Sequence, residues 1–164
     1  MATIRAYEPS DWPSVWPILR AAIAAGDTFA WDPLSTEAEV HEAWIEAPEA
    51  TFVAYDEDAR ILGCYFIKPN QPGLGAHVCN AGYCTDVAVR SRGIAAQMCE
   101  HSQQEAITRG FRAMQFNFVI ATNEPAVHLW RKLGFEIVGR LPKAYRHLRL
   151  GFVDALVMYK SLLT

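Results

Sequence analysis

The chain has 164 residues, of which 51% are hydrophobic and 20% are charged, a composition that favours one domain with a real core. The net charge is −3 and no run of Lys or Arg occurs, which argues against nucleic acid or an anionic membrane as the main partner. No apolar stretch approaches membrane-spanning length, and the N-terminus does not resemble a signal peptide, so we expect a cytoplasmic protein.

The four cysteines lie at positions 64, 79, 84 and 99, inside segments that we predict to be strands or a helix. Free cysteine in such segments behaves as a small hydrophobic side chain. His77, Cys79 and Cys84 are conceivable metal ligands, but no paired Cys-x-x-Cys clusters with zinc-site spacing occur. We therefore expect reduced core thiols and no metal.

Alternation and capping signals predict the elements of the first half of the chain. Ser10 or Asp11 is placed to cap a first helix, and Thr36 with Glu39 forms a capping box that opens a second helix. The apolar face of the first helix is predicted to comprise Trp12, Trp16, Leu19, Ala22 and Ile23. In chain order we expect a strand at 3–7, helices at 11–25 and 37–47, and strands at 51–55 and 61–68.

A small-residue loop, Arg-Ser-Arg-Gly-Ile-Ala at 90–95, connects an extended segment at 76–85 to the main helix. Small or apolar residues recur at helical spacing from Ile94 to Ala106, and Gly110 is placed to end the helix. The first N–H groups of such a helix have no internal partners and lie at the positive end of its dipole, which is typical of a phosphate site. On the residues alone, an ordinary strand-to-helix turn explains the loop equally well.

The last third of the chain is predicted to contain a strand, a short helix and two further strands. We place the strand at 113–120 and the helix at 125–133, with Thr122 or Asn123 as its N-cap and Gly134 closing it. The final strands are expected at 135–138 and 152–161, joined by a connecting segment at 141–151. The resulting order, βααβββαβαββ, predicts a mixed α/β fold with helices covering an open sheet.

The motif Arg-x-x-Gly-x-Ala at 90–95 resembles the Arg/Gln-x-x-Gly-x-Gly/Ala signature of the GNAT superfamily of acetyl-CoA-dependent N-acetyltransferases. The segment 123–135 is similar to a second motif of that family, a short helix that ends in Leu-Gly-Phe. The predicted element order agrees with the family along nearly the whole chain. Segments 26–29 and 115–123 most resemble the branch of phosphinothricin-type and related small amino-acid acetyltransferases.

This resemblance implies one N-acetyltransferase domain over residues 1–164, of α/β (α+β) class, with a mixed central sheet of about seven strands, four flanking helices, and a splay between the fourth and fifth strands. It implies that the diphosphate of coenzyme A rests on the loop and that the pantetheine arm runs along the fourth strand like an added strand. Asn123 would contact the cofactor arm, with a plain N-cap as the alternative. The cofactor-binding residues implied in this way are Tyr83, Cys84, Thr85, Arg90, Ser91, Arg92, Gly93, Ile94, Ala95, Ala96 and Asn123.

Acetyl transfer to an amine needs a base, donors for the tetrahedral oxyanion and departure of the thiolate. By family likeness, a backbone N–H near Thr85 is the oxyanion donor. Trp130 departs from the family pattern, because many relatives place there a tyrosine that protonates the thiolate, and an indole N–H is a donor only. Tyr83 or water is the candidate replacement, unless the thiolate leaves unaided. No Asp or Glu lies on the fourth strand, which favours a base acting through ordered water.

Four side chains are candidates for binding the acceptor. Asn117 on the fifth strand would orient the amine or stabilise the oxyanion if it faces the cleft, and Asn80 on the fourth strand is similar. A satisfied Asn bonded to neighbouring backbone explains both equally well. Phe29 and Trp31 would wall the acceptor pocket, or they simply pack the first loop onto the core.

We therefore expect transfer of an acetyl group from acetyl-CoA to the amine of a small amino-acid-like molecule, by direct attack through a tetrahedral intermediate. Family likeness also favours a homodimer. Two alternatives remain open. A protein or peptide amine as acceptor would require an open groove, and a coenzyme A-binding sensor without turnover is suggested by the missing tyrosine at position 130.

Overall fold

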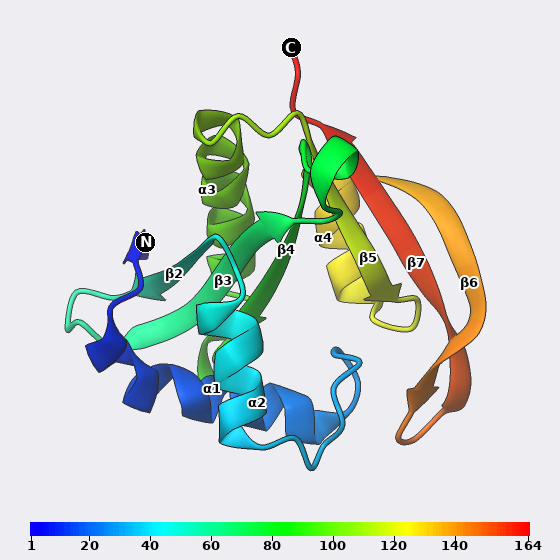
Figure 1. The fold of residues 1–164 in the computed structure, drawn as a ribbon. Helices are drawn as coiled ribbons and strands as arrows, with labels where there is room; N and C mark the ends of the chain where they lie inside the picture. The colour runs from blue at the N-terminus through cyan, green and yellow to red at the C-terminus, as the bar shows by residue number, and fades with distance from the viewer.

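Seven strands form one mixed sheet in the order β1-β2-β3-β4-β5-β7-β6 in the computed structural model, which describes residues 1–164 (Figure 1). All neighbouring strands are antiparallel except β4 and β5, which are parallel. The strands are β1 (Thr3–Ala6), β2 (Ala50–Tyr55), β3 (Ile61–Pro69), β4 (Val78–Thr85), β5 (Ala113–Ile120), β6 (Glu136–His147) and β7 (Gly151–Ser161). The helices are α1 (Trp12–Ala25), α2 (Glu37–His41, extended by a π-helical turn, Glu42–Glu46), α3 (Ile94–Thr108) and α4 (Glu124–Lys132). The order and the mixed sheet confirm the predicted fold.

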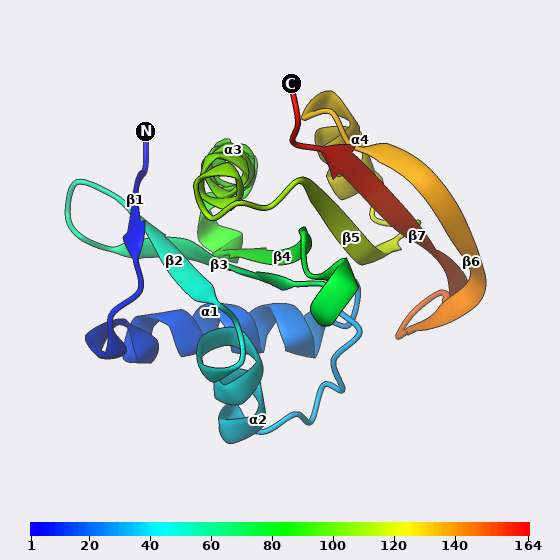
Figure 2. The same ribbon diagram turned by 45° about the horizontal axis from the view of Figure 1, so that its top comes forward.

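Helices cover both faces of the sheet and give the molecule two apolar cores (Figure 2). On one face α1 and α2 pack Val15, Leu19 and Trp44 against the first strands. On the other face α3 and α4 lie over a larger core that includes Met98 and Phe116. The predicted face of α1 packs on the core beside α1 and α2, with Trp12 and Trp16 half-buried at its margin, and the prediction omitted the buried Val15 and Ile18. No helix of the structure combines the length and apolar character needed to cross a bilayer.

All four cysteines are buried, as predicted. Cys64 and Cys84 belong to the core beside α1, and Cys79 and Cys99 to the core beside α3. Burial raises the pKa of Cys79 and of Cys84 to about 12 and that of Cys99 to about 11. These thiols are therefore protonated packing groups near neutral pH.

Helix ends follow the capping signals of the sequence. Thr36 and Glu39 form the predicted capping box, with the Glu39 N–H donating to Thr36 Oγ1 at 3.2 Å and the Thr36 N–H donating to Glu39 Oε2 at 2.8 Å. Gly26 ends α1 with φ +65°. Gly134 follows α4 with φ +96°, and a Cβ there would lie 3.1 Å from Lys160 Cε, so the glycine of the Leu-Gly-Phe motif is required locally.

The predicted connecting segment at 141–151 was wrong, because β6 continues to His147. The strand passes a bulge between Leu141 and Tyr145, in which Lys143 has φ +50°. Asp154 of β7 holds this bulge by accepting the Lys143 N–H at 2.9 Å and pairing with Arg140 at 2.8 Å. A bulge absorbs an irregular stretch without ending the strand, so β6 and β7 form one long hairpin.

Candidate functional site

The sheet is splayed between β4 and β5, as predicted. The two strands pair only at Val78 with Ala113 and at Cys79 with Met114. The Asn70 N–H donates to the Val78 carbonyl, and the Asp86 N–H donates to the Leu62 carbonyl, so even-numbered β4 residues direct their backbone groups toward β3.

It follows from this alternation that Ala81, Tyr83 and Thr85 direct their N–H and C=O groups into the gap, where β5 no longer pairs with them. Cys84 lies between two of them, but its backbone faces β3, and its side chain is buried near the Ile18 carbonyl. The gap is thus lined on the β4 side by unpaired backbone groups that an extended ligand can satisfy.

Amide side chains occupy the place where the ladder between β4 and β5 stops. Asn80 Nδ2 donates to the Gln115 carbonyl oxygen at 3.0 Å and so bridges the two strands. Gln115 Nε2 donates to Asn117 Oδ1 at 2.9 Å, and Asn117 Nδ2 donates to Asn70 Oδ1 at 2.7 Å. Asn117 is exposed. Part of the predicted amide set is therefore structural, since Asn80 holds the sheet closed beside the gap.

Alternation along β5 places Asn117 on the face opposite Phe116, and a bulge after Phe116 places Phe118 there as well. Phe116 pairs with Met158 and Val119 with Leu156, so Asn117 and Phe118 together oppose a single residue of β7. Phe116 and Val119 both belong to the core beside α3. Asn117 and Phe118 therefore lie on the opposite face of the sheet, which α1 and α2 cover at the earlier strands (Figure 2).

The loop before α3 presents free backbone N–H groups. Ser91 has φ +65° and Gly93 has φ +78°, and α3 begins without a side-chain cap or an acidic residue in its first turn. The first helical bond is from the Gln97 N–H to the Gly93 carbonyl, at 3.1 Å. The N–H groups of the helix start, up to Ala96, therefore lack intrahelical acceptors, which suits an anion.

The predicted loop residues are accessible at this helix start. Arg90, Ser91, Arg92 and Gly93 are exposed, Ala95 and Ala96 are half-buried, and Ile94 is buried in the core. A Cβ at Gly93 would meet nothing closer than Gln97 Nε2 at 3.9 Å, so the space in front of the backbone is open. A diphosphate can reach the backbone here, and the two arginines add positive charge.

Aromatic rings line the gap on the side of α3 and α4. The Tyr83 ring lies 5.2 Å from Trp130, which in turn lies 5.1 Å from Phe116. Ser102 Oγ donates to the Cys99 carbonyl, so the Tyr83 hydroxyl, 2.6 Å away, donates to Ser102. Burial raises the pKa of Tyr83 well above its ordinary value. The expectation that Tyr83 protonates the thiolate finds no support here, because its proton points into the core.

Asn123 caps α4, since its Oδ1 accepts the Ala126 N–H at 3.4 Å. Its Nδ2 has no hydrogen-bond partner within the chain. The side chain can therefore serve both as a cap and as a donor to a ligand at the α4 end of the gap. No group of three or more His, Cys, Asp or Glu side chains gathers as a possible metal site.

An aromatic cluster packs on the face of the sheet opposite the loop that precedes α3. Phe29 lies edge-on to Trp44 at 5.8 Å, and Trp44 edge-on to Phe66 at 4.9 Å. The Tyr145 hydroxyl donates to the Phe29 carbonyl at 3.1 Å and so ties the loop after α1 to β6. Phe29 and Trp31 are half-buried against the core beside α1, so they pack the loop and also leave part of their rings accessible.

Sequence reasoning did not select Trp44, Phe66 or Tyr145 for this cluster, in which Trp44 and Tyr145 are buried and Phe66 is half-buried. One local signal existed for Phe66. A Cβ at Gly82 would lie 2.6 Å from Phe66 Cε1, so the glycine on β4 is what allows the Phe66 ring to lie over that strand. From the sequence, Gly82 alone does not indicate which side chain lies over it, because that depends on the register of β3 and β4.

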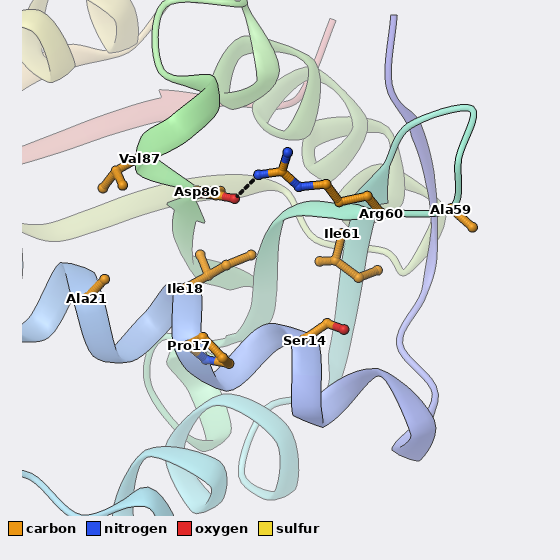
Figure 3. Close-up of a pocket in the computed structure, with 9 residues that line it drawn as sticks. All are labelled: Ser14, Pro17, Ile18, Ala21, Ala59, Arg60, Ile61, Asp86 and Val87. Atoms are coloured by element: carbon orange, nitrogen blue, oxygen red, sulfur yellow. Dashed lines mark hydrogen bonds and ion pairs between the residues drawn. The ribbon is translucent and has the colours of Figure 1, made fainter.

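A separate pocket of about 320 Å³ lies between α1 and the segment that leads to the loop before α3 (Figure 3). Arg60 Nη2 donates to Asp86 Oδ2 across its upper side at 2.7 Å, and Pro17 and Ile18 lie on its α1 side (Figure 3). Asp86 also accepts the Ala88 N–H at 3.0 Å, and this hydrogen bond together with Arg60 lowers the pKa of the carboxyl. The pocket contains no predicted site residue, and the charges of Arg60 and Asp86 neutralise each other. The ion pair between them positions the connection from β4 to α3.

Residues 10–135 match the model of the acetyltransferase (GNAT) family. The chain is 35% identical over 112 residues to the N-acetyltransferase aca1 of Schizosaccharomyces pombe, a match that covers 68% of this chain and 54% of that protein. It thus spans about half the length of the curated relatives that it matches.

Solved structures show the same fold. A GCN5-related N-acetyltransferase from Kribbella flavida superposes with a TM-score of 0.93 at 38% identity, over 98% of this chain and 97% of that one. A phosphinothricin acetyltransferase from Sinorhizobium meliloti, solved in complex with acetyl-CoA, superposes with a TM-score of 0.85 at 20% identity, over 98% of this chain and 88% of that one.

Proposed function

The chain belongs to the GNAT family of acetyltransferases, and we propose on that basis that it transfers the acetyl group of acetyl-CoA to the amine of a small amino-acid-like acceptor. The observation that carries the proposal is the gap between β4 and β5, with unpaired backbone groups at Ala81, Tyr83 and Thr85 and an uncapped helix start beside it.

Coenzyme A fits this arrangement in two parts. The diphosphate accepts hydrogen bonds from the backbone between Ser91 and Ala96, with Arg90 and Arg92 at the rim. The pantetheine arm enters the gap as a short strand along Tyr83 to Thr85, bonding the backbone groups that β5 leaves unpaired. Asn123 Nδ2 donates to the arm from the other wall.

In the reaction, the acceptor amine attacks the thioester carbonyl carbon, the oxyanion forms, and the C–S bond breaks. We assign the oxyanion donor to a backbone N–H of the gap near Thr85, because such a donor is fixed before the reaction begins. Asn117 orients the acceptor while Asn80 holds β4 and β5 together at the end of their ladder, and an ordered water carries the amine proton away. Trp130 packs against the arm and supplies no acid, so the thiolate leaves unaided or is protonated by water.

The acceptor side of the site supports a small substrate. The loop after α1, which carries the half-buried Phe29 and Trp31, is tied to β6 by the hydrogen bond from Tyr145 to the Phe29 carbonyl, and this tie favours a walled acceptor site over an open groove. We further propose that residues 1–164 act as one domain and form a homodimer through the β6–β7 hairpin, whose edge strand exposes Val138 and whose partner strand exposes Phe152.

The test is thiol release from acetyl-CoA across a panel of free amino acids, amino-acid analogues, polyamines and peptides. One strong small acceptor supports the proposal. Turnover confined to peptides identifies a protein acetyltransferase, and tight acetyl-CoA binding with no turnover of any amine identifies a sensor. Either of these outcomes overturns the proposed function.

A further inference from the structure

Lys68 is an unpaired cation on the acceptor face of the sheet. It lies on β3 and is half-buried, and no carboxylate in the structure forms an ion pair with it. Its ammonium group lies 5.4 Å from the centroid of the Phe66 ring, within the range of a cation–π contact. A half-buried charge with only an aromatic partner is well placed to accept an anionic ligand.

The register of β3 and β4 places this ammonium group next to the gap. Lys68 is the direct partner of Asn80, so the two side chains share one face of the sheet. The Phe66 ring under the ammonium group lies over Gly82, the next residue of β4 on that face. Lys68 Nζ is therefore held alongside the stretch of β4 where pairing with β5 has stopped.

The neighbouring polar groups are neutral amides. Asn70 follows β3 two residues after Lys68, and its Oδ1 accepts from Asn117 across the mouth of the gap. The Asn70 Nδ2 group has no partner within the chain, so it is available as a donor. One cation and several amide donors, with no carboxylate bonded to any of them, make a site that complements a carboxylate.

We propose that Lys68 binds the carboxylate of the acceptor and so selects free α-amino acids over amines without that group. The inference rests on the proposed function, because the amine must reach a thioester held between β4 and β5. Neighbouring strands lie about 4.8 Å apart, so an arm added beside β4 lies about two strand spacings, or about 10 Å, from β3. The Lys68 side chain and a bound α-amino acid, whose carboxylate and amine are separated by one carbon atom, together bridge this distance.

The experiment compares Lys68→Met, Lys68→Arg and Arg20→Met with the wild type on the standard L-amino acids and their primary amides. Lys68→Met removes the charge at similar length, and Lys68→Arg keeps it. Arg20 is an exposed residue of α1 without an ion pair, so its variant controls for the change in net charge. The readouts are kcat and KM for each acceptor and KM for acetyl-CoA.

We expect Lys68→Met to raise KM for the preferred amino acid about 10- to 100-fold, the factor that one hydrogen bond to a charged group represents. The amide should lose little, kcat and KM for acetyl-CoA should stay near wild type, and Lys68→Arg should restore most of the preference. Equal losses on acid and amide, or no loss on either, overturn the role of Lys68 while leaving the acetyltransferase in place. Turnover of no amino acid at all overturns the proposed acceptor class, and the role of Lys68 with it.

Discussion

Replacing Gly93 by Glu tests the binding of the coenzyme A diphosphate to the start of α3. Gly93 has φ +78°, and in the free protein a Cβ there would meet only Gln97 Nε2, at 3.9 Å. The substitution therefore costs about 1–2 kcal/mol of backbone strain without a clash. For a chain of this length that cost lowers Tm by about 2–8 °C and leaves the protein folded.

The effect on binding should be much larger. The new side chain occupies the space that the phosphates need, and its carboxylate repels them. Loss of two charge-assisted hydrogen bonds costs about 3–6 kcal/mol, which weakens binding about 10²- to 10⁴-fold. Isothermal titration with coenzyme A measures this change directly, and thermal unfolding of the free variant separates it from misfolding.

Gly73→Glu is the matched control. Gly73 has φ +57° and nothing within 4 Å of its ideal Cβ, so it carries similar strain far from the loop in sequence. This variant should lose a similar amount of stability and bind coenzyme A like the wild type. Binding by Gly93→Glu within threefold of the wild type, or an equal loss in Gly73→Glu, would refute the placement of the diphosphate.

Three further variants test the chemistry and the fold. Asn117→Ala should lower kcat/KM for the acceptor about tenfold, the size of one lost neutral hydrogen bond, with KM for acetyl-CoA kept; unchanged kinetics would make Asn117 purely structural. Trp130→Tyr should change kcat by less than about twofold, because a thiolate leaves readily near neutral pH, and a large gain would show that thiolate protonation is limiting. Asp11→Asn should lower the free energy of unfolding by about 1–3 kcal/mol at pH 7, since Arg5 pairs with this buried carboxylate through two bonds of 2.8 Å. Because Arg5 lowers the pKa of Asp11 below its usual 3.8, this difference should persist above about pH 4 and shrink as acid protonates the folded carboxyl, which urea denaturation at pH 7 and pH 3 can measure.

Local signals predicted the parts of the fold that depend on neighbouring residues. The capping box at Thr36 and the left-handed glycines at Gly26 and Gly110 depend on a few adjacent positions, and all three are as expected. The predicted end of β6 was wrong because the residue that stabilises the rest of this strand is distant in the sequence. Asp154 of β7 holds the Lys143 bulge, and nothing between Leu141 and Gly151 indicates that support.

The candidate site likewise has a part that local sequence predicts and a part that depends on distant residues. The loop around Gly93 could be predicted because a strand, a small-residue turn and a helix start are consecutive in the chain. The proximity of Lys68 to Asn80, and of Asn70 to Asn117, depends on strand register and on a bulge in β5. These pairings are long-range, so the spacing of residues along the sequence does not predict them.

The gap between β4 and β5 also leaves two unpaired strand edges in the interior of a sheet. Unpaired edges invite pairing with foreign chains, a hazard that proteins usually confine to charged or covered outer strands. On the proposed placement the shielding would come from the substrate, since an arm bonded to Tyr83 and Thr85 would occupy the edge that an aggregating strand needs. Acetyl-CoA at about 100 times its Kd should add about 2.7 kcal/mol to the stability of the folded chain. It should also slow hydrogen exchange at the Ala81, Tyr83 and Thr85 amides, so the bound acetyl donor would protect the inner strand edge as well as supply the acetyl group.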